Sequence, residues 1–159
     1  MQQKTQPETQ HFPVSGAGLG LRRGMIDQLM AVPPAQIDFM EVAPENWIGV
    51  GGKLGKKFRF FTERYPFLIH GLSLSLGAPS PLNETLLRDI RKFMDVHGIQ
   101  SYSEHLSYCG DNGQLYDLMP IPFTADAVDY VAARIRRARS AKVRSCRGRS
   151  SPRSHRSRT

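Results

Sequence analysis

The chain has 159 residues, a formal net charge of +8 and only two cysteines, Cys109 and Cys146. This length suits about one domain and falls short of the roughly 250 residues of a complete (β/α)₈ barrel. So few cysteines argue against a disulfide framework, and no apolar run has the length of a signal-peptide core or of a membrane span, so we expect a cytoplasmic protein.

The elements expected along the chain alternate between strands and helices. Apolar runs predict strands at residues 16–21, 37–42, 67–70 and 99–105. Helical spacing predicts helices at 25–31, 54–64, about 84–97 and from 124 onward, the last with Val128, Val131, Ala132 and Ile135 inside. This βαβαβαβα order implies parallel strands joined by right-handed crossovers, and therefore an α/β sheet that is either doubly wound or part of a barrel.

Two further segments carry local signals, one of an extended segment and one of a turn. Residues 72–77 alternate between leucine and serine, as an extended segment does, and Asp111-Asn112-Gly113 predicts a hairpin turn between Tyr108 and Tyr116.

The charge divides the sequence into three parts. Residues 139–159 contain seven arginines, one lysine and six serines but no carboxylate, and residues 1–138 are neutral overall. We therefore expect a polar leader at 1–15, a folded domain at 16–138 and a disordered basic tail at 139–159.

Polar, metal-capable side chains lie at the ends of three predicted strands, those at 37–42, 67–70 and 99–105. His70 ends the strand at 67–70, and Glu104 and His105 end the next one. Because the carboxyl ends of parallel strands meet on one face of a barrel, these side chains are expected to converge there. Imidazole together with carboxylate suits iron, manganese or zinc, so we interpret His70 and His105 as metal ligands with Glu104 near the site.

The segment after residue 42 contributes further candidates. Glu45 and Asn46 could orient a ligand or a bound water without touching the metal, whereas Trp47 is better explained by packing. The glycines of residues 16–20 lack the G-x-G-x-x-G spacing of a dinucleotide site, so we reject that interpretation. No residue is assigned as catalytic.

Four motifs in this order resemble one known family: EVAPENW at 41–47, HGLSLSLG at 70–77, YSEHLSY at 102–108 and LYDLMPIPFT at 115–124. Over residues 16–138 the chain resembles the bacterial multinuclear non-haem iron-dependent oxidases. The resemblance implies a TIM barrel with two or three irons that uses dioxygen to modify side chains, commonly cysteines, of ribosomally made precursor peptides. It also implies a small partner protein that delivers the peptide. By this resemblance His70 and His105 are iron ligands, with Glu45, Asn46 and Glu104 nearby.

The sequence departs from the family pattern after Ala138. Later strands with further Asp, Glu and His ligands are expected there, and the basic tail instead resembles a coding sequence translated in the wrong frame. We therefore expect a truncated chain, about the first four βα units of the barrel, with open strand edges that favour self-association. Such a chain has too few ligands for a multinuclear cluster and is expected to be inactive.

Two alternatives stay open at this stage. A xylose-isomerase-like barrel, an isomerase or a nuclease, would use another divalent metal without oxygen uptake. The basic tail could instead bind nucleic acid nonspecifically through phosphate contacts, in a salt-sensitive way.

Overall fold

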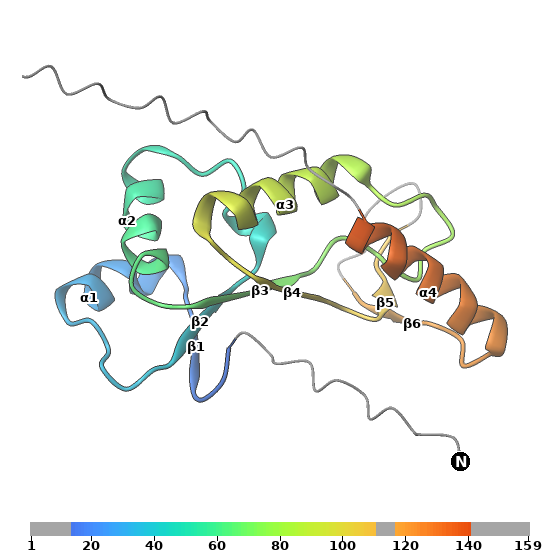
Figure 1. Cartoon of the computed structure of the whole chain (residues 1–159), viewed down its shortest axis with the longest axis horizontal. Coiled ribbons are helices and arrows are strands. Elements are labelled where there is room, and N and C mark those ends of the chain that lie inside the picture. The colour runs from blue at the N-terminus through green and yellow to red at the C-terminus, as the bar shows by residue number, and fades with distance from the viewer. Residues whose placement is uncertain (1–13, 111–116, 141–159) are drawn as a thin grey trace, which may run out of the picture.

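A four-stranded parallel sheet forms the centre of the protein (Figure 1). The computed structural model describes residues 14–110 and 117–140. The strands are β1 (Gly18–Gly20), β2 (Phe39–Val42), β3 (Phe67–Gly71) and β4 (Ser101–Glu104), and they lie side by side in the order of the sequence. All three neighbouring pairs are parallel, which confirms the predicted α/β sheet. An α/β crossover follows each of the first three strands, as parallel pairing requires.

The helices also follow the predicted order. They are α1 (Ile26–Ala31), α2 (Gly52–Thr62), α3 (Glu84–His97) and α4 (Ala125–Ser140), and two short 3₁₀ turns, η1 (Arg23–Met25) and η2 (Pro44–Asn46), follow β1 and β2. Asn83 caps α3 by accepting hydrogen bonds from two backbone amides, and Gly98 ends it in the left-handed conformation. Helix α4 ends at Ser140.

Helices α2 and α3 cover one face of the sheet. Strand residues alternate between the two faces, and the register places Met40 beside Phe67 and Val42 beside Ile69 on the covered face. Phe58 of α2 is 2% exposed and stacks on Trp47, with 4.4 Å between the ring centroids. The packing interpretation of Trp47 is thereby confirmed. The opposite face presents Glu41 and Leu68.

Helix α4 is less buried than its apolar spacing predicts. Val131 is only 6% exposed, but Val128 is 67% exposed and Ile135 38% exposed. The expectation that all the apolar residues of this helix lie inside is therefore wrong, because within 14–110 and 117–140 nothing covers one side of the apolar stripe.

Residues 72–77, one of the two segments with local signals, differ from expectation. They form bends and turns instead of a strand, because their amides bond to side chains and, at Gly77, to the carbonyl oxygen of Ser107. A short antiparallel pair joins β5 (Ser107–Tyr108) to β6 (Met119–Pro120), and the predicted turn at 111–113 lies outside the described residues, as does most of the tail. In the described ranges, no helix combines the length and apolar character that crossing a membrane requires.

Candidate metal centre

His70 and His105 meet at the carboxyl ends of β3 and β4. His70 lies on the sheet face opposite the helices, and His105 directly follows the last residue of β4. Their Nε2 atoms are 3.0 Å apart, and the rings cross at 71° with centroids 4.4 Å apart. The structure thus brings together the two histidines that the sequence singled out. At this distance one of the two Nε2 atoms can donate a hydrogen bond to the other.

Ser103 orients the His70 ring. It lies beside His70 in the parallel register, and its hydroxyl Oγ is 2.8 Å from His70 Nδ1. The Ser103 hydroxyl also donates to the carbonyl oxygen of Ile69 at 3.5 Å, which leaves its lone pairs free to accept the proton on His70 Nδ1. With the proton on Nδ1, Nε2 of His70 carries the lone pair that a metal needs. Sequence analysis missed Ser103, since its role depends on the register between β3 and β4.

Glu45 binds the backbone that follows His70. It lies in η2, and its Oε1 accepts hydrogen bonds from the amides of Leu72 at 2.8 Å and Ser73 at 3.0 Å. Its Oε2 is buried without a hydrogen-bond partner among the described residues. Glu45 therefore holds the loop next to His70 through charged hydrogen bonds, which are stronger than neutral ones.

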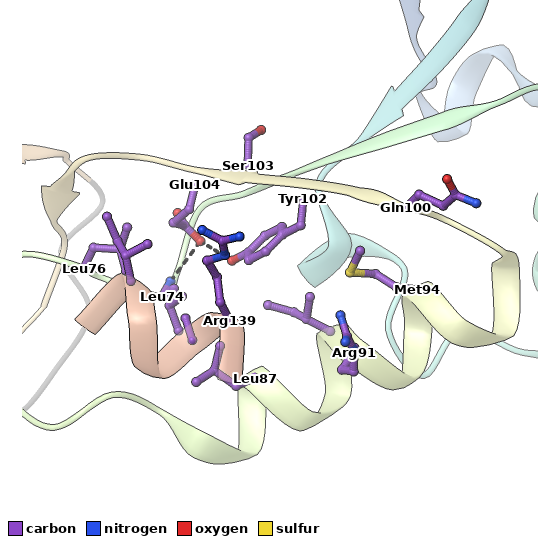
Figure 2. A pocket seen from close by; sticks show the side chains of 13 residues that line it. Leu74, Leu76, Leu87, Arg91, Met94, Gln100, Tyr102, Ser103, Glu104 and Arg139 are labelled. Atoms are coloured by element: carbon purple, nitrogen blue, oxygen red, sulfur yellow. Dashed lines mark hydrogen bonds between the residues drawn. The ribbon is translucent and has the colours of Figure 1, made fainter. Parts of the chain in front are cut away.

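Glu104 points away from the histidine pair. Figure 2 shows Tyr102 and Glu104 projecting from β4 toward α3 and α4, whereas Ser103 between them points to the other face. The Tyr102 hydroxyl donates to Glu104 Oε2 at 2.6 Å, and the amides of His105 and Leu74 also donate to this carboxyl. Adjacent strand residues point to opposite faces, so Glu104 cannot share a face with Ser103.

Burial dominates the electrostatics of this pair. Desolvation raises the pKa of Glu104 above its ordinary value, and the charge of Glu45 adds to the rise, although the hydrogen bonds that Glu104 accepts oppose it. Burial and the bond to Glu104 raise the pKa of Tyr102 as well. Tyr102 therefore remains a hydrogen-bond donor at neutral pH.

A glycine is required where these groups crowd together. A Cβ atom at Gly71 would lie 2.3 Å from Glu104 Oε2 and 2.6 Å from the Tyr102 hydroxyl oxygen. Any side chain there would push the Glu104 carboxylate and the Tyr102 ring out of this arrangement.

Asn46 and His70 line the same cavity, which has a volume of about 460 Å³. Asn46 is exposed, and its backbone oxygen accepts a hydrogen bond from the guanidinium of Arg23. Among the described hydrogen bonds, none involves its side-chain amide.

The loop at 72–80 is anchored by residues that sequence analysis missed. Ser75 has a positive φ of 53°, and its hydroxyl accepts a hydrogen bond from the Cys109 amide at 2.9 Å. Arg134 of α4 donates to the carbonyl oxygens of Ser75 at 3.1 Å and Ser80 at 2.8 Å, and Tyr130 donates to that of Ala78 at 2.6 Å. Helix α4 therefore fixes the segment that leads away from His70.

The carboxylates do not complete a ligand set around the two imidazoles. Across residues 14–110 and 117–140, no group of three or more His, Cys, Asp or Glu side chains is arranged to hold a metal ion. The described part of the site is thus a pair of converging histidines held by Ser103 and, through the loop, by Glu45.

The fold and the site define an α/β protein with metal-capable side chains at the carboxyl ends of parallel strands. The family model of the RiPP precursor modification enzymes MbnB/TglH/ChrH matches residues 16–145, and the chain belongs to this family. RiPPs are ribosomally made, post-translationally modified peptides. The match continues beyond the domain boundary expected at residue 138.

Three curated relatives are each named UPF0276 protein. One from Alcanivorax borkumensis is 63% identical over 129 residues, which cover 78% of this chain and 43% of the relative. One from Pseudomonas aeruginosa is 61% identical over 123 residues, covering 77% of this chain and 43% of the relative. One from Nitrosospira multiformis is 59% identical over 129 residues, which cover 80% of this chain and 46% of the relative. The chain therefore spans less than half the length of these relatives.

Proposed function

We propose that His70 and His105 are iron ligands in an oxidase that uses dioxygen to modify side chains of a ribosomally made precursor peptide. The observation that carries this proposal is the 3.0 Å separation of the two Nε2 atoms at the carboxyl ends of neighbouring parallel strands. Active sites of parallel α/β barrels lie at this end of the strands.

The donor atoms present suit iron. Neutral imidazole is a good ligand for iron as well as for zinc and copper, and Ser103 supports the tautomer of His70 that leaves Nε2 free. Bound iron would supply the one-electron chemistry that lets dioxygen react with an organic side chain. The role of the protein's own groups is to hold the two nitrogens together and to fix the loop beside them.

The peptide substrate follows from the family description, since the family consists of enzymes that modify RiPP precursors. We propose cysteine as the modified side chain and a small partner protein that delivers the peptide. Glu45, Asn46 and Glu104 are proposed as supporting residues that act on the backbone or the packing around the two histidines.

We further propose that this chain alone has no oxidase activity. The described residues bring two imidazoles together, whereas a cluster of two or three irons needs several more nitrogen and oxygen ligands. A single weakly held ion is the expected product of metal loading.

Anaerobic titration of the purified chain with ferrous iron tests the site. Wild type should bind about one iron per chain, and His70→Ala and His105→Ala should each weaken binding by at least about 10-fold. His97→Gln is the matched control, because it removes an imidazole at the end of α3 and should leave binding unchanged. Equal binding by wild type and the double variant would refute the proposed ligands.

The same samples distinguish the metal chemistry. Slow oxidation of bound ferrous iron on exposure to air, at a rate that changes in the histidine variants, supports a redox centre. Preferential binding of zinc, magnesium or manganese with no oxygen uptake would favour the isomerase or nuclease alternative instead.

A further inference from the structure

The cavity that Asn46 and His70 share lies at the carboxyl ends of β1, β2 and β3. It has a volume of about 460 Å³, and Arg22, Arg23 and Glu41 are its charged lining residues among those that the structure describes. Pockets that bind small ligands have volumes in this range. In the described residues, no hydrogen bond or ion pair joins these charged side chains to His70. The cavity therefore adjoins the candidate metal centre, and its charges are left for another role.

Arg22 lies over the sheet face that carries His70. Gly20 pairs with Glu41 and Glu41 with Leu68, and His70 is two residues further along β3, so these positions share one face. A Cβ atom at Gly20 would have Arg22 Nε 4.0 Å away as its nearest neighbour outside the adjacent residues. The missing side chain at Gly20 thus leaves room for the Arg22 guanidinium above the end of β1.

Arg23 is held in place by two contacts. One Nη atom donates to the backbone oxygen of Asn46, and the guanidinium lies over the Trp47 ring, 5.4 Å from its centroid. Arginine favours such a position on an aromatic face. A guanidinium has five N–H donors, so most of those on Arg23 remain for a ligand. Arg23 therefore presents an ordered, charged donor group at the edge of the cavity.

The positive charge of this cavity is not neutralised within residues 14–110 and 117–140. Neither Arg22 nor Arg23 forms an ion pair there, and Glu41 supplies the one carboxylate of the described lining. Two arginines against one glutamate leave a net positive charge. Asn46 adds a side-chain amide that takes part in no described hydrogen bond. The cavity thus offers several unused donors to an anion.

Carboxylate is the anion that suits these donors in a peptide. The planar guanidinium donates two parallel hydrogen bonds to the two oxygens of a carboxylate, and such charged bonds are stronger than neutral ones. We propose that Arg22 and Arg23 bind a carboxylate of the precursor peptide, next to the side chain that is modified at His70. This rests on the proposed function, which makes the substrate a peptide. An acidic side chain and a carboxyl terminus present the same chemistry.

Titration of the 159-residue chain with short peptides tests the carboxylate site. The probes are N-acetyl-Gly-Cys-Glu-Gly-amide, the same peptide with Gln in place of Glu, and the Gln peptide with a free carboxyl terminus. NMR shifts of the backbone amides of Arg22, Asn46 and Leu72 give the dissociation constants. At low ionic strength the Glu peptide should bind about 10-fold more tightly than the Gln amide. Tighter binding of the free-terminus peptide alone would assign the site to a terminal carboxylate.

Substitutions in the cavity identify the groups that bind. Arg23→Gln should reduce the preference for the Glu peptide to about 2-fold or less, and Arg22→Gln should reduce it by about 2–5-fold. Both residues are exposed, so the variants should fold as wild type does by circular dichroism. Glu41→Gln should bind the Glu peptide about 2–5-fold more tightly than wild type, because it removes a like charge from the same cavity.

Arg88→Gln is the matched control. Arg88 is an exposed arginine of α3 that does not line this cavity, so the variant makes the same change in net charge elsewhere and should leave the preference unchanged.

Three results would overturn the proposal. They are equal affinity for all three peptides, a preference that Arg88→Gln lowers as much as Arg22→Gln and Arg23→Gln do, and a Glu41→Gln variant that binds the Glu peptide no more tightly than wild type. Iron titration separates this failure from that of the proposed function. A chain that binds iron through its histidines without preferring a carboxylate refutes the carboxylate site alone, and the opposite pair of results refutes the metal ligands.

Discussion

Replacement of Glu45 tests its role in holding the loop that follows His70. Oε1 of Glu45 accepts two backbone hydrogen bonds, from Leu72 and Ser73, while Oε2 is buried without a partner in the described structure. Glu45→Ala removes both oxygens, and Glu45→Gln keeps one acceptor for the two amides and removes only the charge.

The magnitudes follow from these contacts. A hydrogen bond to a charged group contributes about 1.5–3 kcal/mol, so the two bonds together contribute roughly 3–6 kcal/mol. Removing the unpartnered Oε2 returns about 1–3 kcal/mol of desolvation cost, and water can solvate the freed amide of the exposed Leu72. We therefore expect Glu45→Ala to lower the free energy of unfolding by about 2–3 kcal/mol. In Glu45→Gln the two bonds become neutral and weaken by about 2–3 kcal/mol together, but the relief of about 1–3 kcal/mol of desolvation cost at the buried Oε2 offsets this, so the variant should stay within about 1 kcal/mol of wild type.

Urea unfolding followed by tryptophan fluorescence measures these values. Trp47 is the chain's one tryptophan, is 4% exposed and lies two residues from Glu45, so it reports on this region. Amide hydrogen exchange at Ser73 should also accelerate in Glu45→Ala and much less in Glu45→Gln. A stability loss in Glu45→Gln as large as that in Glu45→Ala would refute the reasoning, because the charge and not the acceptor would then be essential.

Three further predictions concern the surroundings of the site and the core. Ser103→Ala should weaken ferrous iron binding by about 10–100-fold without unfolding the chain, since it frees the His70 ring, and unchanged affinity by titration would contradict this. Burial, and then the charge of Arg59, lowers the pKa of His97 below its ordinary 6.5, so the folded chain favours the neutral ring. This contribution to the free energy of unfolding is present above pH 6.5 and is lost as the pH falls through the lowered pKa. Urea unfolding at several pH values should show this loss in wild type and not in His97→Gln. The same dependence of the unfolding free energy on pH in both proteins would count against the assignment. Phe58→Ala should cost about 3–5 kcal/mol in the same assay, because Phe58 is only 2% exposed, and a cost below about 1 kcal/mol would show that the core is not packed as described.

The strand ends could be predicted from the sequence because each combines a short apolar run with a following polar residue. His70 and His105 occupy equivalent places after neighbouring strands, and parallel pairing brings such places together. The two ends of α3 could also be predicted from the sequence, because Asn83 and Gly98 are residue types that commonly cap helices.

The directions of individual side chains could not be predicted in the same way. Glu104 and His105 are adjacent in sequence, yet the β4 pleat turns Glu104 toward the helices. The partners of Glu45 depend on the path of the loop after β3, which departs from its alternating pattern. The link between Ser103 and His70 requires the register of two strands more than 30 residues apart.

Helix α4 shows a different limit of sequence analysis. Its apolar spacing correctly indicates a helix with an apolar stripe, but periodicity does not say what covers that stripe. Val131 is buried, while Val128 and Ile135 are exposed within the described structure. Periodicity therefore predicts a surface that favours burial, and the partner that buries it has to be found by experiment.

X-ray absorption spectroscopy of the chain loaded anaerobically with ferrous iron tests the central claim most directly. The scattering of imidazole rings bound to iron gives the number of histidine ligands. The proposed ligation of one iron by both His70 and His105 predicts two imidazoles per iron in wild type and one in His105→Ala. Iron bound without imidazole in wild type, or with the same number in both proteins, would contradict the assignment of these histidines as metal ligands.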